Sequence, residues 1–134
     1  MKRAFGSFLL ASLLFTLASA QESCPAAPQG KTAWFDPCKY LFIAHGVTPA
    51  RAVSIKDPSY TDSARRKKIN GQVILAVALN AQGTIDEVKV VRSLDPGLDQ
   101  ASIDAVRQWR FSPATKDSKP VAVQFEVETQ FRLY

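Results

Sequence analysis

The chain has 134 residues, enough for one domain with a modest hydrophobic core and a short extension. Lysine and arginine total 17 against 12 aspartate and glutamate, and leaving out Lys2 and Arg3 lowers the net charge from +5 to +3. So small a positive charge argues against a nucleic-acid-binding protein.

Residues 1–20 have the pattern of a secretory signal peptide. A basic start precedes an apolar run from Phe8 to Leu17, and Ala18-Ser19-Ala20 is a small-x-small cleavage site. We therefore predict cleavage before Gln21 and a periplasmic protein. The alternative is an uncleaved inner-membrane anchor, for which the uncharged run 4–20 lies at the lower limit of the roughly 17 to 25 residues that span a bilayer.

Residues 21–56 are predicted to form an irregular N-terminal lobe. Their prolines and glycines exclude a long helix or strand, while aromatic residues such as Trp34 and Phe35 make the segment too apolar for a free linker. Cys24 and Cys38 are the two cysteines of the chain, and in an exported protein they most simply form a disulfide, the alternative being two free thiols. The CxxC spacing of a redox enzyme is absent, so the predicted disulfide is structural.

The main domain is predicted to cover residues 57–134 and to open with a short helix. A turn at Asp57-Pro58 is followed by an N-cap at Thr61 or Asp62, and the basic run 65–68 forms the last turn. Cations stabilise the C-terminus of a helix, and this explains the basic run better than an anionic ligand does.

Two strands follow, over Gln72–Leu79 and Ile85–Leu94. Apolar residues alternate along both, and the short loop Asn80–Gly83 joins them as an antiparallel hairpin.

The stretch from Leu98 to Ala114 is predicted to begin with the central helix. Phe111 and Pro113 end it, because proline restricts the residue before it and donates no hydrogen bond. The residues on the predicted buried face are Leu98, Ala101, Ser102, Ala105, Val106 and Trp109.

The last predicted strand, Val121–Leu133, alternates between an apolar and a polar face. Together the elements predict an α+β fold: a three-stranded antiparallel sheet of order 2-1-3 with two helices packed on one face. The last strand is then an edge, which accepts an extended peptide by strand addition or pairs with a second copy of the chain. An edge blunted by its own charges or covered by the lobe is the open alternative.

Catalytic chemistry has little support in the sequence. His45 is the single histidine, without a partner at metal-ligand spacing, and no nucleophile, phosphate-loop or zinc motif occurs. We predict no enzyme, no metal and no cofactor. An envelope enzyme or inhibitor with a site in the lobe, at His45 or Trp34, is a weak alternative.

The predicted domain resembles the C-terminal domain of the TonB energy-transducer family. In that family a strand hairpin is followed by a helix ending W-x-F-x-P and by a final strand, as in GQVILAVALNAQGTIDEVKVVRSL, LDQASIDAVRQWRFSPA and KPVAVQFEVETQFRL. DPSYTDSARR is similar to the family's opening Y-P-x-x-A-R. Thr61, Leu94-Asp95 and Ser118 depart from the family pattern, at turns.

The resemblance implies binding, in the periplasm, of the short extended box near the N-terminus of outer-membrane transporters, in energy-coupled transport across the outer membrane. The box of such a transporter adds beside the last strand, and the stretch before the first helix also contacts the transporter. The positions implied are Gln124, Glu126, Glu128 and Gln130 along the edge, with Asp57, Pro58 and Tyr60 before the helix.

The resemblance also raises the question of force transduction. A full transducer of the family has an inner-membrane helix and a long proline-rich spacer, whereas residues 21–56, at about 3.3 Å each when extended, are too few to cross the periplasm. We expect a chain that binds but does not transduce force by itself. The alternative is a minimal transducer anchored by residues 1–20.

Overall fold

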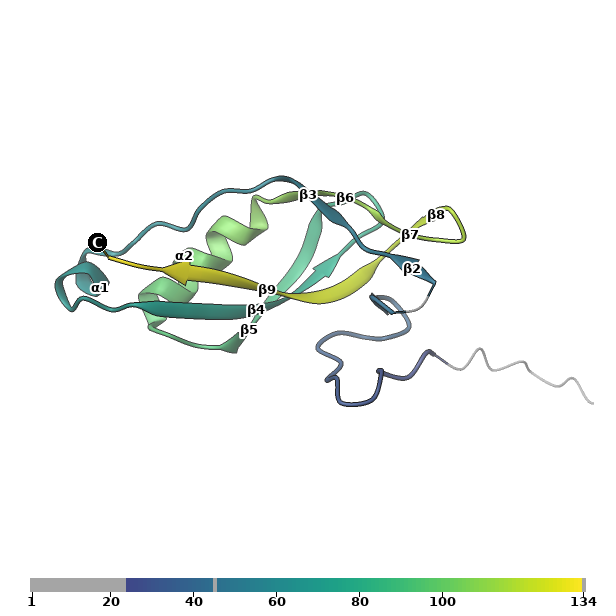
Figure 1. Ribbon diagram of the computed structural model, residues 1–134, viewed down its shortest axis with the longest axis horizontal. Helices are drawn as coiled ribbons and strands as arrows, with labels where there is room; N and C mark the ends of the chain where they lie inside the picture. The colour runs from purple at the N-terminus through teal and green to yellow at the C-terminus, as the bar shows by residue number, and fades with distance from the viewer. Residues whose placement is uncertain (1–23, 45, 134) are drawn as a thin grey trace, which may run out of the picture.

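The computed structural model describes residues 24–44 and 46–133 (Figure 1). The predicted signal peptide with its cleavage site, and His45, lie outside the described residues. In chain order the elements are β1 (Leu41–Phe42), β2 (Val47–Thr48), β3 (Arg51–Ser54), α1 (Asp62–Arg66), β4 (Gly71–Leu79), β5 (Ile85–Arg92), α2 (Pro96–Arg107), β6 (Arg110–Ser112), β7 (Ala114–Lys116), β8 (Lys119–Val121) and β9 (Val123–Phe131). The described part of the chain is therefore an α+β fold with two helices.

The main sheet has the strand order β1-β9-β4-β5. Its central strand β4 pairs antiparallel with β5 through the predicted hairpin, and with β9 along its whole length. The order of the three long strands agrees with the prediction. A sheet of only three strands is wrong, because β1 from the N-terminal lobe pairs parallel with the start of β9, at Val123 and Gln124.

Two smaller sheets extend the fold beyond the predicted elements. β7 pairs with β2 and β8, and β6 pairs with β3. The central helix ends earlier than the predicted stop at Phe111. α2 ends at Arg107, and residues 110–112 already belong to β6. The predicted last strand is likewise divided, into β8 and β9.

Both helices begin at side-chain caps. The Thr61 hydroxyl accepts the N–H of Ala64 at 3.1 Å, which selects Thr61 from the two predicted N-caps of α1. The Asp95 carboxylate accepts the N–H of Gly97 and of Leu98, at 3.0 and 3.2 Å. Because Asp95 is followed by proline at the first helical position, α2 begins before the predicted Leu98.

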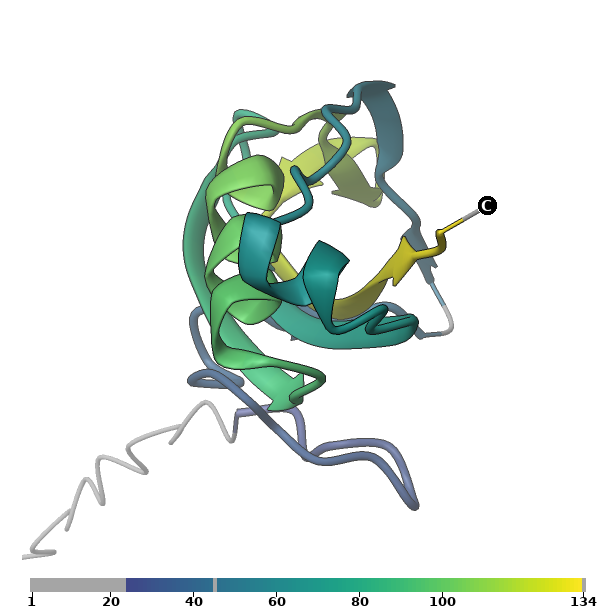
Figure 2. The same cartoon turned by 90° about the vertical axis from the view of Figure 1, so that its left-hand side faces the viewer.

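The main core lies between the helices and the concave face of the sheet. Figure 2 shows the sheet curving around the helices, with the N-terminal lobe against its outer face. The residues buried in this core are Ala64, Val73, Leu75, Val77, Leu98, Val106, Trp109 and Phe131. On the outer face Phe35 and Tyr40 of the lobe pack over Ala76 and Ala78. β4 is thus buried on both faces, which explains its nearly continuous apolar sequence.

The predicted disulfide between Cys24 and Cys38 is present in the lobe, with the two Cα atoms 4.8 Å apart. The carboxylate of Asp36 accepts the N–H of Cys38 at 2.9 Å and so fixes the turn beside it. No helix within residues 24–44 and 46–133 combines the length and the apolar character that crossing a bilayer requires.

Candidate functional site

The candidate site is the outer edge of β9. β1 pairs with Val123 and Gln124, and from Phe125 to Phe131 this side of β9 pairs with no strand of the described chain. The N–H of Leu41 donates to the carbonyl of Ala122 at 2.9 Å, so the carbonyl of Ala122 faces this edge. Main-chain groups alternate in direction along a strand. Those of Glu126, Glu128 and Gln130 therefore also point to the open edge.

The side chains predicted along this edge fall into two groups. Those of Glu126, Glu128 and Gln130 are exposed. Gln124 lies on the same face of the strand but is only 3% exposed. The predicted polar, solvent-facing position is therefore wrong for Gln124, because the lobe covers this face at the start of β9.

Gln124 attaches the lobe to the strand through its side-chain amide. The amide oxygen accepts the backbone N–H of Trp34 and of Phe35, at 3.0 and 3.1 Å. The amide nitrogen donates to the carbonyls of Phe35 and Tyr40, at 3.2 and 2.8 Å. All the polar atoms of this buried side chain thus have partners within the lobe.

The segment before α1 is held near the far end of β9. The ring of Tyr60 packs edge-on against Phe131 with centroids 5.3 Å apart, and its hydroxyl donates to the carbonyl of Ile69. Trp109 donates its indole N–H to the carbonyl of Lys56 at 2.8 Å, which fixes the start of the segment. The structure thus brings Tyr60 next to β9, while Asp57 is exposed and Pro58 half-buried between these two anchors.

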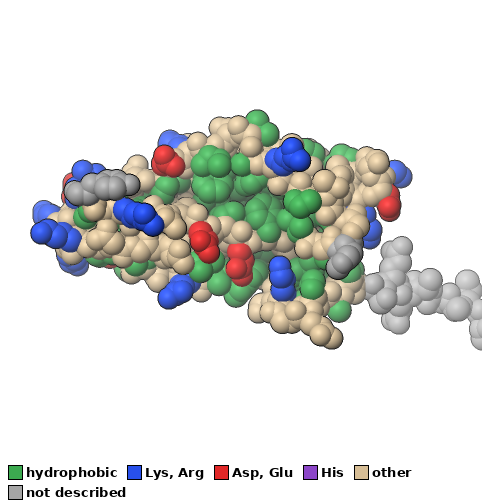
Figure 3. Space-filling model, in the orientation of Figure 1, with side chains coloured by type: hydrophobic (Ala, Val, Ile, Leu, Met, Phe, Trp, Pro, Cys, Tyr) green, Lys and Arg blue, Asp and Glu red, His purple; other side chains and the backbone are tan. Residues whose placement is uncertain are grey.

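Apolar side chains are exposed on the face of the molecule that carries the open edge of β9. Figure 3 shows hydrophobic side chains gathered between β9 and the segment that leads from β3 to α1. Val53 at the end of β3 and Ile55 just after it are 71% and 58% exposed. Exposed apolar surface next to an unpaired strand edge is typical of a protein-binding face.

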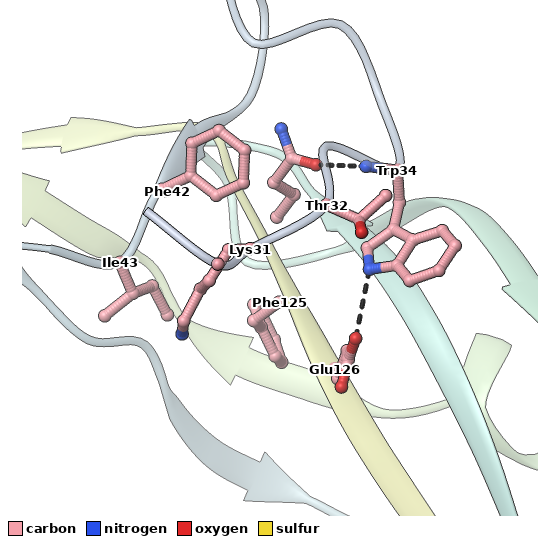
Figure 4. A pocket seen from close by; sticks show the side chains of 9 residues that line it. Lys31, Thr32, Trp34, Phe42, Ile43, Phe125 and Glu126 are labelled. Carbon is pink, nitrogen blue, oxygen red and sulfur yellow. Dashed lines mark hydrogen bonds between the residues drawn. The ribbon is translucent and has the colours of Figure 1, made fainter. Parts of the chain in front are cut away.

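A pocket lies where β1 leaves the edge of β9 (Figure 4). Its volume is about 550 Å³, and its lining residues are Gly30, Lys31, Thr32, Trp34, Phe42, Ile43, Gln124, Phe125 and Glu126. A second hollow, of about 320 Å³, lies at the other end of the strand, beside Gln130, Phe131 and Arg132. The second hollow is also lined by Asn70, Gly71 and Gln72 at the start of β4, so only the first pocket adjoins the open edge of β9.

The lobe side of the pocket was not predicted from the sequence. Trp34 donates its indole N–H to the carboxylate of Glu126 at 3.0 Å, and the ammonium of Lys89 donates to the carbonyl of Trp34 at 2.7 Å. The aromatic content of the lobe was the available signal, but that signal carries no information on which strand the aromatic residues contact.

The groups that this site presents are main-chain hydrogen-bond donors and acceptors, which an extended polypeptide can pair with. Within the residues that the structure describes, no group of three histidine, cysteine, aspartate or glutamate side chains is placed to hold a metal ion. The open edge offers N–H and carbonyl groups at every second residue, with a pocket at one end and exposed apolar side chains nearby.

Comparison with known proteins places this geometry in a family. The sequence profile described as "Gram-negative bacterial TonB protein C-terminal" matches residues 56–133. "Protein TonB" of Vibrio cholerae is 35% identical over 86 residues, which cover 63% of this chain and 35% of that protein. "Protein TonB" of Xanthomonas campestris is 33% identical over 81 residues, covering 60% and 36%. The chain thus spans about a third of the length of these curated relatives.

A solved structure supports the fold. The solution NMR structure of the Pseudomonas aeruginosa TonB CTD aligns with a TM-score of 0.54 and 24% identity, and the alignment covers 68% of this chain and 90% of that one.

Proposed function

The chain belongs to the family of Gram-negative bacterial TonB protein C-terminal domains, and from this premise we propose that it is a non-catalytic periplasmic protein-interaction module. Its partner in this proposal is an outer-membrane TonB-dependent transporter. The bound element is an extended, TonB-box-like segment of that transporter, which adds as a strand beside β9 in energy-coupled transport across the outer membrane.

The observation that supports this proposal is the open edge of β9. Main-chain hydrogen bonds from Glu126, Glu128 and Gln130 provide affinity for any extended chain, and alternate side chains provide selectivity. The two glutamates on this edge also disfavour pairing with a second copy of the same strand, because like charges then meet across it.

In this proposal the chain has three parts, each with its own role. Residues 1–20 act as a signal peptide, 21–56 form the lobe, and 57–134 form the binding domain. The partner-binding residues are Glu126, Glu128 and Gln130 on the edge, with Asp57, Pro58 and Tyr60 before α1. Gln124 has the different role of holding the lobe on the start of the strand.

The test is a titration of the protein with a synthetic peptide of a transporter's N-terminal box, followed through backbone amide resonances. Strand addition is expected to shift the amides of residues 125–131 and to leave those of β5 on the opposite edge unchanged. Unchanged spectra at millimolar peptide, or shifts confined to β5, would contradict the proposal.

A matched pair of variants tests the use of the backbone. Glu128→Pro removes one outward-facing N–H without removing a hydrogen bond to β4, so the sheet is retained and peptide binding is expected to weaken about tenfold. Glu128→Gln keeps this N–H and changes only the carboxylate. Equal affinities for the two variants would show that binding does not depend on this main-chain donor.

Mass spectrometry of the exported protein tests the proposed location. A mature N-terminus at Gln21 supports a periplasmic module, whereas retention of residues 1–20 supports a membrane-anchored one.

A further inference from the structure

The N-terminal lobe changes one end of the open edge. Residues 24–44 lie outside the family match, which begins at residue 56. β1 covers the first two residues of β9 and then leaves the edge after Phe42. A strand that adds to β9 therefore ends where the lobe begins, and the pocket lies at that point.

The walls of the pocket combine large apolar side chains with polar ones. Figure 4 shows Phe42 and Ile43 from the lobe on one side and Phe125 from β9 between them and Trp34. The polar residues of the lining are Lys31, Thr32, Gln124 and Glu126. A volume of about 550 Å³ lies within the range of pockets that enclose small organic groups.

The Trp34 wall is fixed before any ligand binds. Its backbone N–H donates to Gln124, its indole N–H donates to Glu126, and its carbonyl accepts from Lys89. The ammonium of Lys89 also lies 4.7 Å from the ring centroid of Phe35, the next residue of the lobe. A wall held in this way loses little conformational entropy on binding, so apolar contacts there contribute to affinity.

We propose that this pocket binds a large apolar side chain, aromatic or branched aliphatic, of the end residue of the peptide strand that adds to β9. The inference rests on the proposed function and specifies the chemistry of the partner. The pocket is continuous with the open edge through Phe125 and Glu126, so the end residue of the added strand is the one that reaches it. An acidic end residue gains less than an apolar one, because its charge loses water against Trp34, Phe42 and Phe125. Lys31 and Glu126 place opposite charges in the lining, so the pocket has no net charge to compensate this loss.

The test uses two series of capped octapeptides with a constant centre of alternating threonine and valine. One series carries phenylalanine, leucine, alanine or aspartate at the first position, and the other carries them at the last. In one of the two series the phenylalanine and leucine peptides are expected to bind about tenfold tighter than the alanine peptide, and the aspartate peptide is expected to bind no more tightly than the alanine peptide. The indole N–H resonance of Trp34 is expected to shift with the amides of residues 125–131.

The outcomes separate this inference from the proposed function. If no peptide shifts residues 125–131, strand addition itself fails. If the peptides shift these residues but bind equally well whatever the end residue, and Trp34 does not move, the pocket inference is overturned while strand addition stands. Binding of capped phenylalanine amide alone, as tight as that of the octapeptide, overturns it as well, because the pocket is then an independent small-molecule site.

A pair of neighbouring substitutions tests the pocket directly. Thr32→Trp places a bulky side chain in the lining and is expected to remove the preference for phenylalanine over alanine. Ala33→Trp, at the next exposed residue, which does not line the pocket, is expected to retain that preference. Retention of the preference in Thr32→Trp would overturn the inference.

Discussion

The side-chain oxygen of Gln124 accepts the backbone N–H of Trp34 at 3.0 Å, and this contact joins the last strand to a lobe ninety residues earlier in the chain. The same amide binds Phe35 and Tyr40, so one buried side chain connects three residues of the lobe to the sheet. The position of the lobe in turn sets how much of the β9 edge is open.

Replacing Gln124 by leucine is expected to loosen the part of the lobe around Trp34. The substitution leaves the N–H groups of Trp34 and Phe35 without their acceptor, and each buried unsatisfied group costs about 1–3 kcal/mol. The Trp34 indole resonance should move toward its position in an unfolded peptide, while the resonances of α2 stay in place. Gln130→Leu on the exposed part of the same strand is the control, with an expected change in unfolding free energy below about 0.5 kcal/mol. An unmoved Trp34 resonance in Gln124→Leu would contradict this role.

Ser102 and Thr129 are expected to behave as one unit. Their hydroxyls lie 2.7 Å apart between α2 and β9, and both residues are buried. Ser102→Ala alone should lower the unfolding free energy by about 1–2 kcal/mol, because Thr129 keeps only its longer hydrogen bond, to the carbonyl of Val73 at 3.5 Å. Adding Thr129→Val should recover most of that loss, since no polar group is then left unsatisfied at this contact. Urea unfolding of the wild type, Ser102→Ala, Thr129→Val and the double variant measures the coupling. Strictly additive effects would show that the pair is not coupled.

Gly83 is expected to tolerate no side chain. Its φ is +85°, and a Cβ atom there would lie 1.9 Å from the carbonyl oxygen of Phe111. Gly30 is the matched control, because its φ is +78° but open space surrounds it. Gly30→Ala should cost about 1 kcal/mol from backbone conformation alone, and Gly83→Ala about 4 kcal/mol or more, because the backbone of Phe111 must also move. Similar losses in urea unfolding would contradict the close approach.

Tyr40 is expected to make the unfolding free energy of the protein fall as the pH rises into the alkaline range. Burial, together with the hydrogen bond to Asp86 at 2.8 Å, raises the pKa of Tyr40 above its usual value of 10.0, and Lys39 acts in the opposite direction. The folded state therefore holds the phenol proton more tightly than the unfolded state does. The contribution of Tyr40 is complete below the unfolded pKa near 10 and is lost as the pH rises through the higher folded pKa.

Comparison with Tyr40→Phe measures this contribution. The unfolding free energy of the wild type should exceed that of the variant at about pH 8, and the difference should shrink toward about pH 11. A difference that stays constant over this range would show that the ionisation of Tyr40 is not linked to folding.

Elements whose signals are local could be predicted from the sequence. The hairpin of β4 and β5 follows from alternating apolar residues and the turn at Asn80–Gly83, and α1 follows from its Thr61 cap. The start of α2 at Pro96, two residues before the predicted Leu98, also has a local signal, because Asp95 and the proline after it form a standard helix start.

The rest depends on contacts between segments far apart in the chain. Alternation placed Gln124 on the correct face of its strand, but the sequence pattern does not reveal that Trp34 and Phe35 cover this face. The pairing of Leu41 with Val123 and the pocket beside it have the same origin. Such contacts are set by packing of the whole fold, and the pattern within one segment does not determine them.

The short strand β1 limits the register in which another chain can pair with β9. A one-residue slip along a strand edge turns every side chain of the guest to the opposite face. An edge open at both ends permits such slips. Here Leu41 and Phe42 pair with the first two residues of β9 and block that end of the edge. A peptide strand that abuts β1 has one favoured register. The lobe would therefore select the register of pairing, which the main-chain hydrogen bonds of β9 alone do not select.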